Sequence, residues 1–97
     1  MTLYFEGKLG KEQAVVVLRV LETETGFGLV ARGPFAVDLQ LPDAPSPHAV
    51  SLEAAYADGS LRLEFHLEER EAERWCRWLV EQALARGIAL QLARVAR

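Results

Sequence analysis

Residues 50–67 read VSLEAAYADGSLRLEFHL, and this stretch decides the fold. The pair Asp58-Gly59 lies between two runs in which apolar and polar residues alternate. Asp-Gly flanked by such runs is the strongest short-range signal for a two-residue β-hairpin. The sequence therefore predicts a hairpin with its turn at Asp58-Gly59, although a hairpin by itself identifies no chemistry.

The register of this hairpin follows by counting outward from the turn, since side chains alternate between the two faces of a strand. One face carries the pairs Tyr56–Leu61, Ala54–Leu63, Leu52–Phe65 and Val50–Leu67. The other face carries Ala55–Arg62, Glu53–Glu64 and Ser51–His66. A slip of one residue would turn every apolar side chain towards water, so this register is strongly specified. The Glu53–Glu64 pair is unfavourable alone, and a neighbouring basic side chain could offset it.

Composition limits the class of protein. The chain has 97 residues, and we expect residues 1–97 to form a single domain with one core. Hydrophobic residues make up 51% and charged residues 26%, which is typical of a folded protein and not of a disordered one. The net charge of −3 argues against a nucleic-acid partner. The excess of arginine over lysine, with abundant Ala, Leu and Glu, suits a bacterial protein.

The cellular location and the lack of a disulfide are predicted from three features: the apolar runs, the first residues and the cysteine content. Its apolar runs are too short to span a membrane, and its first residues do not form a signal peptide. We therefore expect a cytoplasmic protein with no membrane insertion. The single cysteine, Cys76, excludes an intrachain disulfide, and we expect it to be a small buried hydrophobe.

Strand patterns precede the hairpin at residues 3–9, 14–21, 27–32 and 35–41. Residues 14–21 (AVVVLRVL) are rich in β-branched side chains, which favours a central strand buried on both faces. Residues 42–47 (PDAPSP) predict a stiff loop. Because the turns recur at meander spacing, without helix-length crossovers, the pattern favours an antiparallel sheet or barrel over βαβ units.

The pattern changes to a period of 3.6 residues between Glu69 and Arg86, where it predicts an amphipathic helix. Its apolar stripe is Ala72, Trp75, Cys76, Leu79, Val80 and Ala83. Gly87 is a natural end to this helix, and residues 88–93 alternate as in a last short strand. We therefore expect an α+β fold: a small antiparallel β-barrel or strongly bent sheet of about six strands, with a C-terminal amphipathic helix.

The strand face and the helix stripe are the largest matched apolar surfaces in the sequence. They predict a core that includes Val50, Leu52, Leu63, Phe65, Trp75 and Leu79.

Trp78 departs from the amphipathic pattern of the predicted helix. At 100° per residue it lies about 60° from Trp75, on the side away from the stripe. It either packs at the rim of the core or belongs to a contact surface. Tryptophan and arginine are enriched in interface hot spots. The sequence therefore predicts a protein contact surface at Trp78, Arg74 and Arg77, in a homodimer or with a partner, and rim packing remains the alternative.

Motifs for catalysis, metal binding or nucleotide binding are absent from the sequence. His66 falls on the outer face of its strand, without a second histidine or cysteine at metal spacing. Cys76 has no identifiable basic partner, and the glycines do not have phosphate-loop spacing. We therefore expect no catalytic residue, no metal ligand and no cofactor.

The stretch from Ala14 to about Leu84 resembles a PilZ domain in its layout of an antiparallel meander followed by a closing helix. The nearest local match is residues 48–65, which run directly into a charged amphipathic helix. PilZ domains that bind cyclic di-GMP carry an RxxxR segment before the barrel and a D/N-x-S-x-x-G segment on an early strand. Here the RxxxR segment is Arg70–Arg74, inside the predicted helix, so no ligand residue carries over. The resemblance implies an adaptor-like member that does not bind cyclic di-GMP.

Three function classes remain open at this point. The first is a non-enzymatic regulatory or adaptor domain, PilZ-like, that acts through protein contacts. The second is a small-ligand or nucleotide-binding module that uses a barrel mouth. The third is a small enzyme, which ranks last because the sequence shows no nucleophile with a base and no metal motif.

Overall fold

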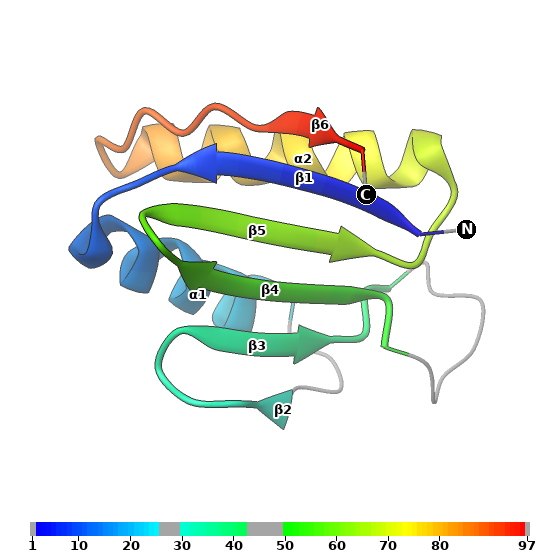
Figure 1. Ribbon diagram of the computed structural model, residues 1–97, viewed down its shortest axis with the longest axis horizontal. Helices are drawn as coiled ribbons and strands as arrows, with labels where there is room; N and C mark the ends of the chain where they lie inside the picture. The colour runs from blue at the N-terminus through cyan, green and yellow to red at the C-terminus, as the bar shows by residue number, and fades with distance from the viewer. Residues whose placement is uncertain (1, 26–29, 43–49, 97) are drawn as a thin grey trace.

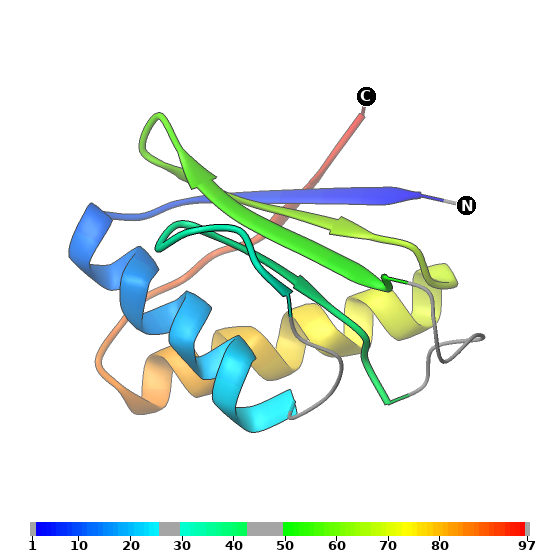
Figure 2. The ribbon, with the colours of Figure 1, turned by 90° about the horizontal axis from the view of Figure 1, so that it is seen from below.

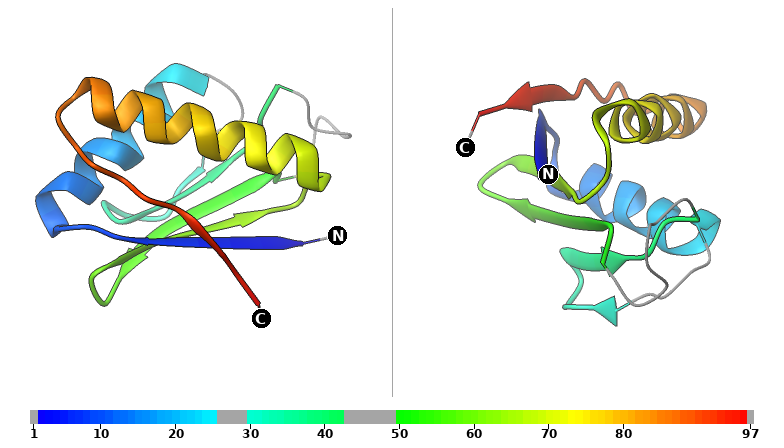
Figure 3. Two further views of the ribbon diagram at one scale, coloured as in Figure 1. Left: turned by 90° about the horizontal axis from the view of Figure 1, so that it is seen from above. Right: turned by 90° about the vertical axis from the view of Figure 1, so that its right-hand side faces the viewer.

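A computed structural model describes residues 2–25, 30–42 and 50–96 of the chain (Figure 1). The elements are β1 (Leu3–Lys8), α1 (Lys11–Thr25), β2 (Val30–Ala31), β3 (Ala36–Leu39), β4 (Leu52–Ala57), β5 (Ser60–Phe65), α2 (Glu69–Ala85) and β6 (Ala93–Val95). The strands form one antiparallel sheet in the order β2-β3-β4-β5-β1-β6. Both described helices lie on the same face of this sheet, and neither of them covers its other face (Figures 2 and 3).

The Asp-Gly hairpin is confirmed. Asp58 and Gly59 have φ angles of 53° and 78°, the pair of positive values that a type I′ turn requires. Strands β4 and β5 pair in the predicted register, with Leu52 opposite Phe65 and Ala57 opposite Ser60. The two-residue turn therefore determines which side chains of both strands face the core.

The α+β class, the antiparallel sheet and the C-terminal helix are confirmed, but the barrel is wrong. Among the described strands, β2 and β6 stand at opposite ends of the sheet order. The sheet that these strands form is therefore open, and the described residues do not enclose a barrel mouth. No helix in the described parts of the chain is long and apolar enough to cross a membrane.

The expected strand at residues 14–21 is wrong, because these residues belong to α1. Ala14, Val17, Leu18 and Leu21 are buried, which is the i, i+3, i+4, i+7 pattern of one helix face. The side chain of Gln13 accepts a hydrogen bond from the Gly10 N–H at 3.2 Å, as in a helix capping box. Packing against the sheet overrides the strand preference of the β-branched residues, which is small. The expected strands therefore do not match the structure one for one.

Helix α2 is confirmed, and it ends as expected. Gly87 has a φ of 77°, and the Ile88 N–H donates to the Ala83 carbonyl at 2.9 Å. This is a Schellman motif, which a left-handed residue such as glycine completes. The expected strand at 88–93 is displaced: residues 88–92 approach β1 without strand structure, and β6 begins at Ala93.

Part of the expected strand at 27–32 is present as β2. Residues 27–29 and most of the expected loop at 42–47 lie outside the described residues.

The core lies between the sheet and the two helices. Leu52, Leu63, Phe65 and Leu79 are buried as predicted.

Two of the predicted core residues are not buried. Trp75 is half-buried, and Val50 is 40% exposed. The alternation of β4 stops at Ser51, which is itself buried and whose Oγ accepts a hydrogen bond from the Leu41 N–H at 2.6 Å. With Ser51 turned inwards next to the buried Leu52, the chain leaves the strand, and Val50 faces solvent.

Candidate functional site

The face of the sheet that lacks helices is charged. Arg62 on β5 pairs with Glu6 on β1 at 3.4 Å, and Arg32 pairs with Asp38 on β3 at 2.8 Å. A shallow depression of about 170 Å³ lies on this face. Pockets for drug-sized ligands usually measure about 300–1,000 Å³, so this depression is small for such a ligand.

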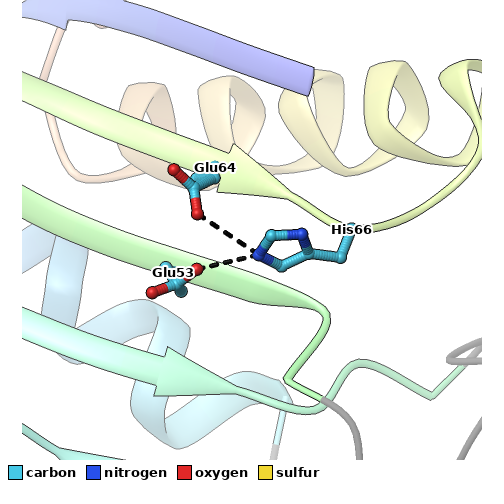
Figure 4. A group of neighbouring side chains, drawn as sticks. All are labelled: Glu53, Glu64 and His66. Carbon is cyan, nitrogen blue, oxygen red and sulfur yellow. Dashed lines mark hydrogen bonds and ion pairs between the residues drawn. The ribbon is translucent and has the colours of Figure 1, made fainter. Parts of the chain in front are cut away.

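Glu53, Glu64 and His66 form a cluster of titratable side chains on this face (Figure 4). Imidazole Nε2 of His66 lies 2.8 Å from Glu53 Oε2 and 3.3 Å from Glu64 Oε2. Glu53 and Glu64 are directly opposite each other on β4 and β5. His66 follows Glu64 by two residues and therefore points to the same face. His66 is thus a basic side chain next to both carboxylates, and it carries a positive charge only when both ring nitrogens are protonated.

The second ring nitrogen of His66 also has a partner. Nδ1 lies 3.2 Å from the hydroxyl oxygen of Thr2. When the proton is on Nε2, the imidazole donates to the carboxylates and Nδ1 accepts from the hydroxyl. The ring is thus held from both sides, although about a third of its side chain remains exposed, at 34%.

Electrostatics favour the ionised form of Glu53. Its pKa is lowered from the ordinary value of 4.5, first by a hydrogen bond with Glu64 and then by the one with His66. Partial burial works in the opposite direction and is the smaller effect. The carboxylate of Glu53 therefore keeps its negative charge at a pH where an isolated glutamate would begin to lose it.

This lowered pKa predicts how stability depends on pH. Ionised Glu53 contributes stability above its unfolded pKa, and that contribution is lost as the pH falls through the lower folded pKa. We expect Glu53→Gln to lower the free energy of unfolding by less than about 1 kcal/mol near pH 7, since the group is partly exposed, and by less still near pH 3. Urea unfolding of both proteins at the two pH values checks this. An equal loss at both would contradict it.

The structure places the predicted contact residues on α2. Trp78 is half-buried against the core, and its ring meets that of Trp75 edge-on, with 5.4 Å between the centroids. Arg74 is exposed and lies 2.5 Å from Glu71, and Arg77 is exposed. Trp78 thus packs in part against the core, while a contact role for its exposed part stays a prediction.

Cys76 is a buried residue of the core, as expected. Burial raises the pKa of its thiol to about 12, with a smaller contribution from the charge of Glu73. The thiol is therefore neutral near neutral pH and is a poor nucleophile.

The sequence reasoning missed the convergence of Glu53, Glu64 and His66, although it placed all three on one face. The predicted register already puts Glu53 opposite Glu64, and His66 is the next residue on that side of β5. The spacing of ligand residues along the chain does not indicate this cluster, because its members come from two strands. The signal that indicates it is the pairing of residues across the predicted hairpin.

No match to this chain was found among protein-family models, curated proteins or solved structures. The PilZ resemblance therefore stays a prediction. Residues 48 and 49 of its local match lie outside the described residues.

Proposed function

We propose that this chain is a non-enzymatic regulatory or adaptor domain that acts through protein contacts made by α2. The contact surface, called the Trp78 face below, consists of Arg74, Arg77, Trp78 and Glu81. These four residues have the i, i+3, i+4, i+7 spacing of one side of a helix. That side lies away from the buried residues Ala72, Cys76, Leu79 and Ala83.

The observation that carries the proposal is the state of Trp78. Its ring is held against the core and against Trp75, yet it is not fully covered. A large aromatic side chain that is already held in place loses little conformational entropy on binding. It stands next to exposed arginines, and tryptophan and arginine are the side chains that dominate interface hot spots.

The charge pattern of the Trp78 face favours a second copy of the same chain as its occupant. In an antiparallel pair of α2 helices with the two-fold axis between Arg77 and Trp78, Arg74 lies opposite Glu81 of the second copy. Trp78 then lies opposite the other copy's Arg77, where a cation–π contact can form. Each contact occurs twice, as the symmetry of an isologous dimer requires.

The size of this surface predicts a weak dimer. Helix α2 has 17 residues and is therefore about 25 Å long. A single pair of such helices falls at the low end of specific interface sizes. We expect a dissociation constant of about 10–100 µM, which suits a regulatory contact that forms and breaks.

The other function classes have less support. The ligand-binding alternative needs a barrel mouth, and the described sheet is open. An adaptor role is also what the PilZ resemblance implies, together with a lack of cyclic di-GMP binding and a cytoplasmic location, which stay predictions.

Trp78→Ala tests the proposal. We expect the substitution to weaken self-association by at least about tenfold in sedimentation equilibrium, because it removes the central anchor. The free energy of unfolding should fall by about 1 kcal/mol, since the ring is only half-buried.

Val16→Ala on α1 is the matched control, because Val16 is also a partly exposed apolar helix residue. It should leave sedimentation unchanged. If Trp78→Ala lowers the free energy of unfolding by several kcal/mol while sedimentation stays the same, Trp78 is a core residue and the proposed contact surface is wrong.

A further inference from the structure

Three potential metal-ligand atoms converge on the open face of the sheet. One atom each from Glu53, Glu64 and His66 lies within 4.8 Å of the other two. Figure 4 shows both carboxylates directed at the same ring nitrogen, Nε2 of His66. We propose that these three side chains bind a divalent transition-metal ion, and that Zn²⁺ is a suitable ion for the site.

The distances between these atoms are close to those of a metal centre. Zn²⁺ holds imidazole nitrogen and carboxylate oxygen at about 2.0–2.2 Å, which separates ligand atoms by about 3.3 Å in a tetrahedron. Nε2 of His66 is 3.3 Å from Glu64 and 2.8 Å from Glu53. The ligand atoms of Glu53 and Glu64 lie within 4.8 Å of each other, so these two flexible side chains would have to adjust around the ion.

Thr2 provides an observation that is independent of the three ligands. Metal-binding histidines usually have a hydrogen-bond partner on their other ring nitrogen, which orients the ring. Here Nδ1 of His66 lies 3.2 Å from the Thr2 hydroxyl. Binding of the ion at Nε2 requires the ring proton to move to Nδ1, where the hydroxyl oxygen of Thr2 can accept it, so Thr2 can hold the ring in the orientation of a ligand.

The charge of the cluster favours a cation. Glu53 and Glu64 stand directly opposite each other, an arrangement that is destabilising without a positive group between them. On the same face Arg62 pairs with Glu6 and Arg32 pairs with Asp38, and the charge of Arg32 also acts on Glu53. A divalent ion would neutralise both carboxylates of the cluster together.

The ligand types decide which ions fit. Imidazole with carboxylate oxygen suits Zn²⁺ and its transition-metal neighbours, whereas Mg²⁺ and Ca²⁺ prefer six or more oxygen ligands. The three side chains are each about a third exposed, at 34–36%, which leaves the remaining coordination positions to water. Glu53 and Glu64 alternate along β4 and β5 with the buried Leu52 and Leu63, so the site lies on the sheet face away from the core and does not depend on the Trp78 face.

Isothermal titration of the whole chain with ZnCl₂ tests the site. We expect one ion per chain with a dissociation constant of about 10 µM, and no measurable binding of MgCl₂. Saturation with Zn²⁺ at about ten times the dissociation constant should raise Tm by about 5 °C, because the ion binds the folded chain.

Substitutions separate this site from other metal contacts. His66→Gln and Glu64→Gln should each weaken Zn²⁺ binding by at least about tenfold, and Thr2→Val by about tenfold through the orientation of the ring. His48→Gln, which removes the other histidine of the chain, and Glu12→Gln, which removes an exposed acid on α1, should leave binding unchanged. All of these side chains except His48 are described and none is fully buried, so we expect the variants to fold, which circular dichroism checks.

Three results would overturn the site. The first is a Zn²⁺ dissociation constant weaker than about 1 mM for the unmodified chain. The second is unchanged Zn²⁺ binding in folded His66→Gln, and the third is loss of binding in His48→Gln. If His66→Gln does not fold, unchanged Zn²⁺ binding in both Thr2→Val and Glu64→Gln would overturn the site instead.

Discussion

Phe65→Ala should lower the free energy of unfolding by about 3–5 kcal/mol, the largest loss that we expect from a single substitution. Phe65 is 1% exposed, and its ring packs edge-to-face on Phe5 with 5.7 Å between the centroids. It lies on β5, opposite Leu3 on one side and Leu52 on the other. Truncation would therefore leave a cavity that three paired strands hold open. Urea denaturation followed by circular dichroism measures the loss.

Phe35→Ala is the matched control for this substitution. Phe35 is only half-buried, and its ring lies 6.1 Å from that of Tyr56 at the edge of the domain. Water can fill the space that it leaves, so we expect a loss of about 1 kcal/mol. A loss below about 1 kcal/mol for Phe65→Ala would show that its site is not closed and that the core is misassigned.

Gly7→Ala should lower the free energy of unfolding by about 2–3 kcal/mol, although it adds a single methyl group. A Cβ atom at this position would lie only 2.4 Å from the carbonyl oxygen of Gln91. That atom belongs to the backbone of the segment that returns from α2, so the whole segment must move. Ile88 and Leu90, which this segment buries in the core, would move with it.

Gly10→Ala is the control for this second prediction. At Gly10 the nearest atom to an added Cβ is Gln13 Oε1 at 3.7 Å, which is an ordinary contact. Thermal and urea unfolding should show a change within about 0.5 kcal/mol for Gly10→Ala. Equal losses for the two variants would mean that the return segment does not pack on β1 as described.

The parts of the fold that the sequence predicts are those with local signals. The turn residues Asp58-Gly59 require positive φ angles, and the alternation on both sides determines the register. The stripe of α2 and its end at Gly87 depend on residues within a few turns of one another. Each of these signals can be read within one short window. The turn, the register and the helix end are confirmed, and four of the six stripe residues are buried, with Trp75 and Val80 half-buried.

The parts of the fold that the sequence does not predict depend on contacts between residues far apart in the chain. Residues 14–21 fit both a buried strand and one face of a helix, and packing under β3 and β4 selects the helix. Gly7 and Gln91 are far apart in the chain, and no local sequence pattern predicts their close approach. Whether a meander closes into a barrel depends on its two edges, which here stand at opposite ends of the sheet.

The Trp78 face and the cluster of Glu53, Glu64 and His66 also differ in whether a local sequence signal indicates them. Trp78 is visible in the sequence because it breaks the stripe of its own helix. The cluster of Glu53, Glu64 and His66 is visible only when two strands are read side by side, since its atoms meet across β4 and β5. Burial of Cys76 follows from its place on the stripe, but the approach of Trp75 and Trp78 to each other needs the structure.

Charge reversal on the Trp78 face tests the proposed function most directly. In the antiparallel arrangement Arg74 lies opposite Glu81 of the second copy, so Arg74→Glu and Glu81→Arg each place like charges together. Sedimentation equilibrium should show at least about tenfold weaker association for each single variant and recovery to within about threefold for the double variant. A wild-type chain that stays monomeric at about 500 µM, or a double variant no better than the singles, would contradict self-association through α2.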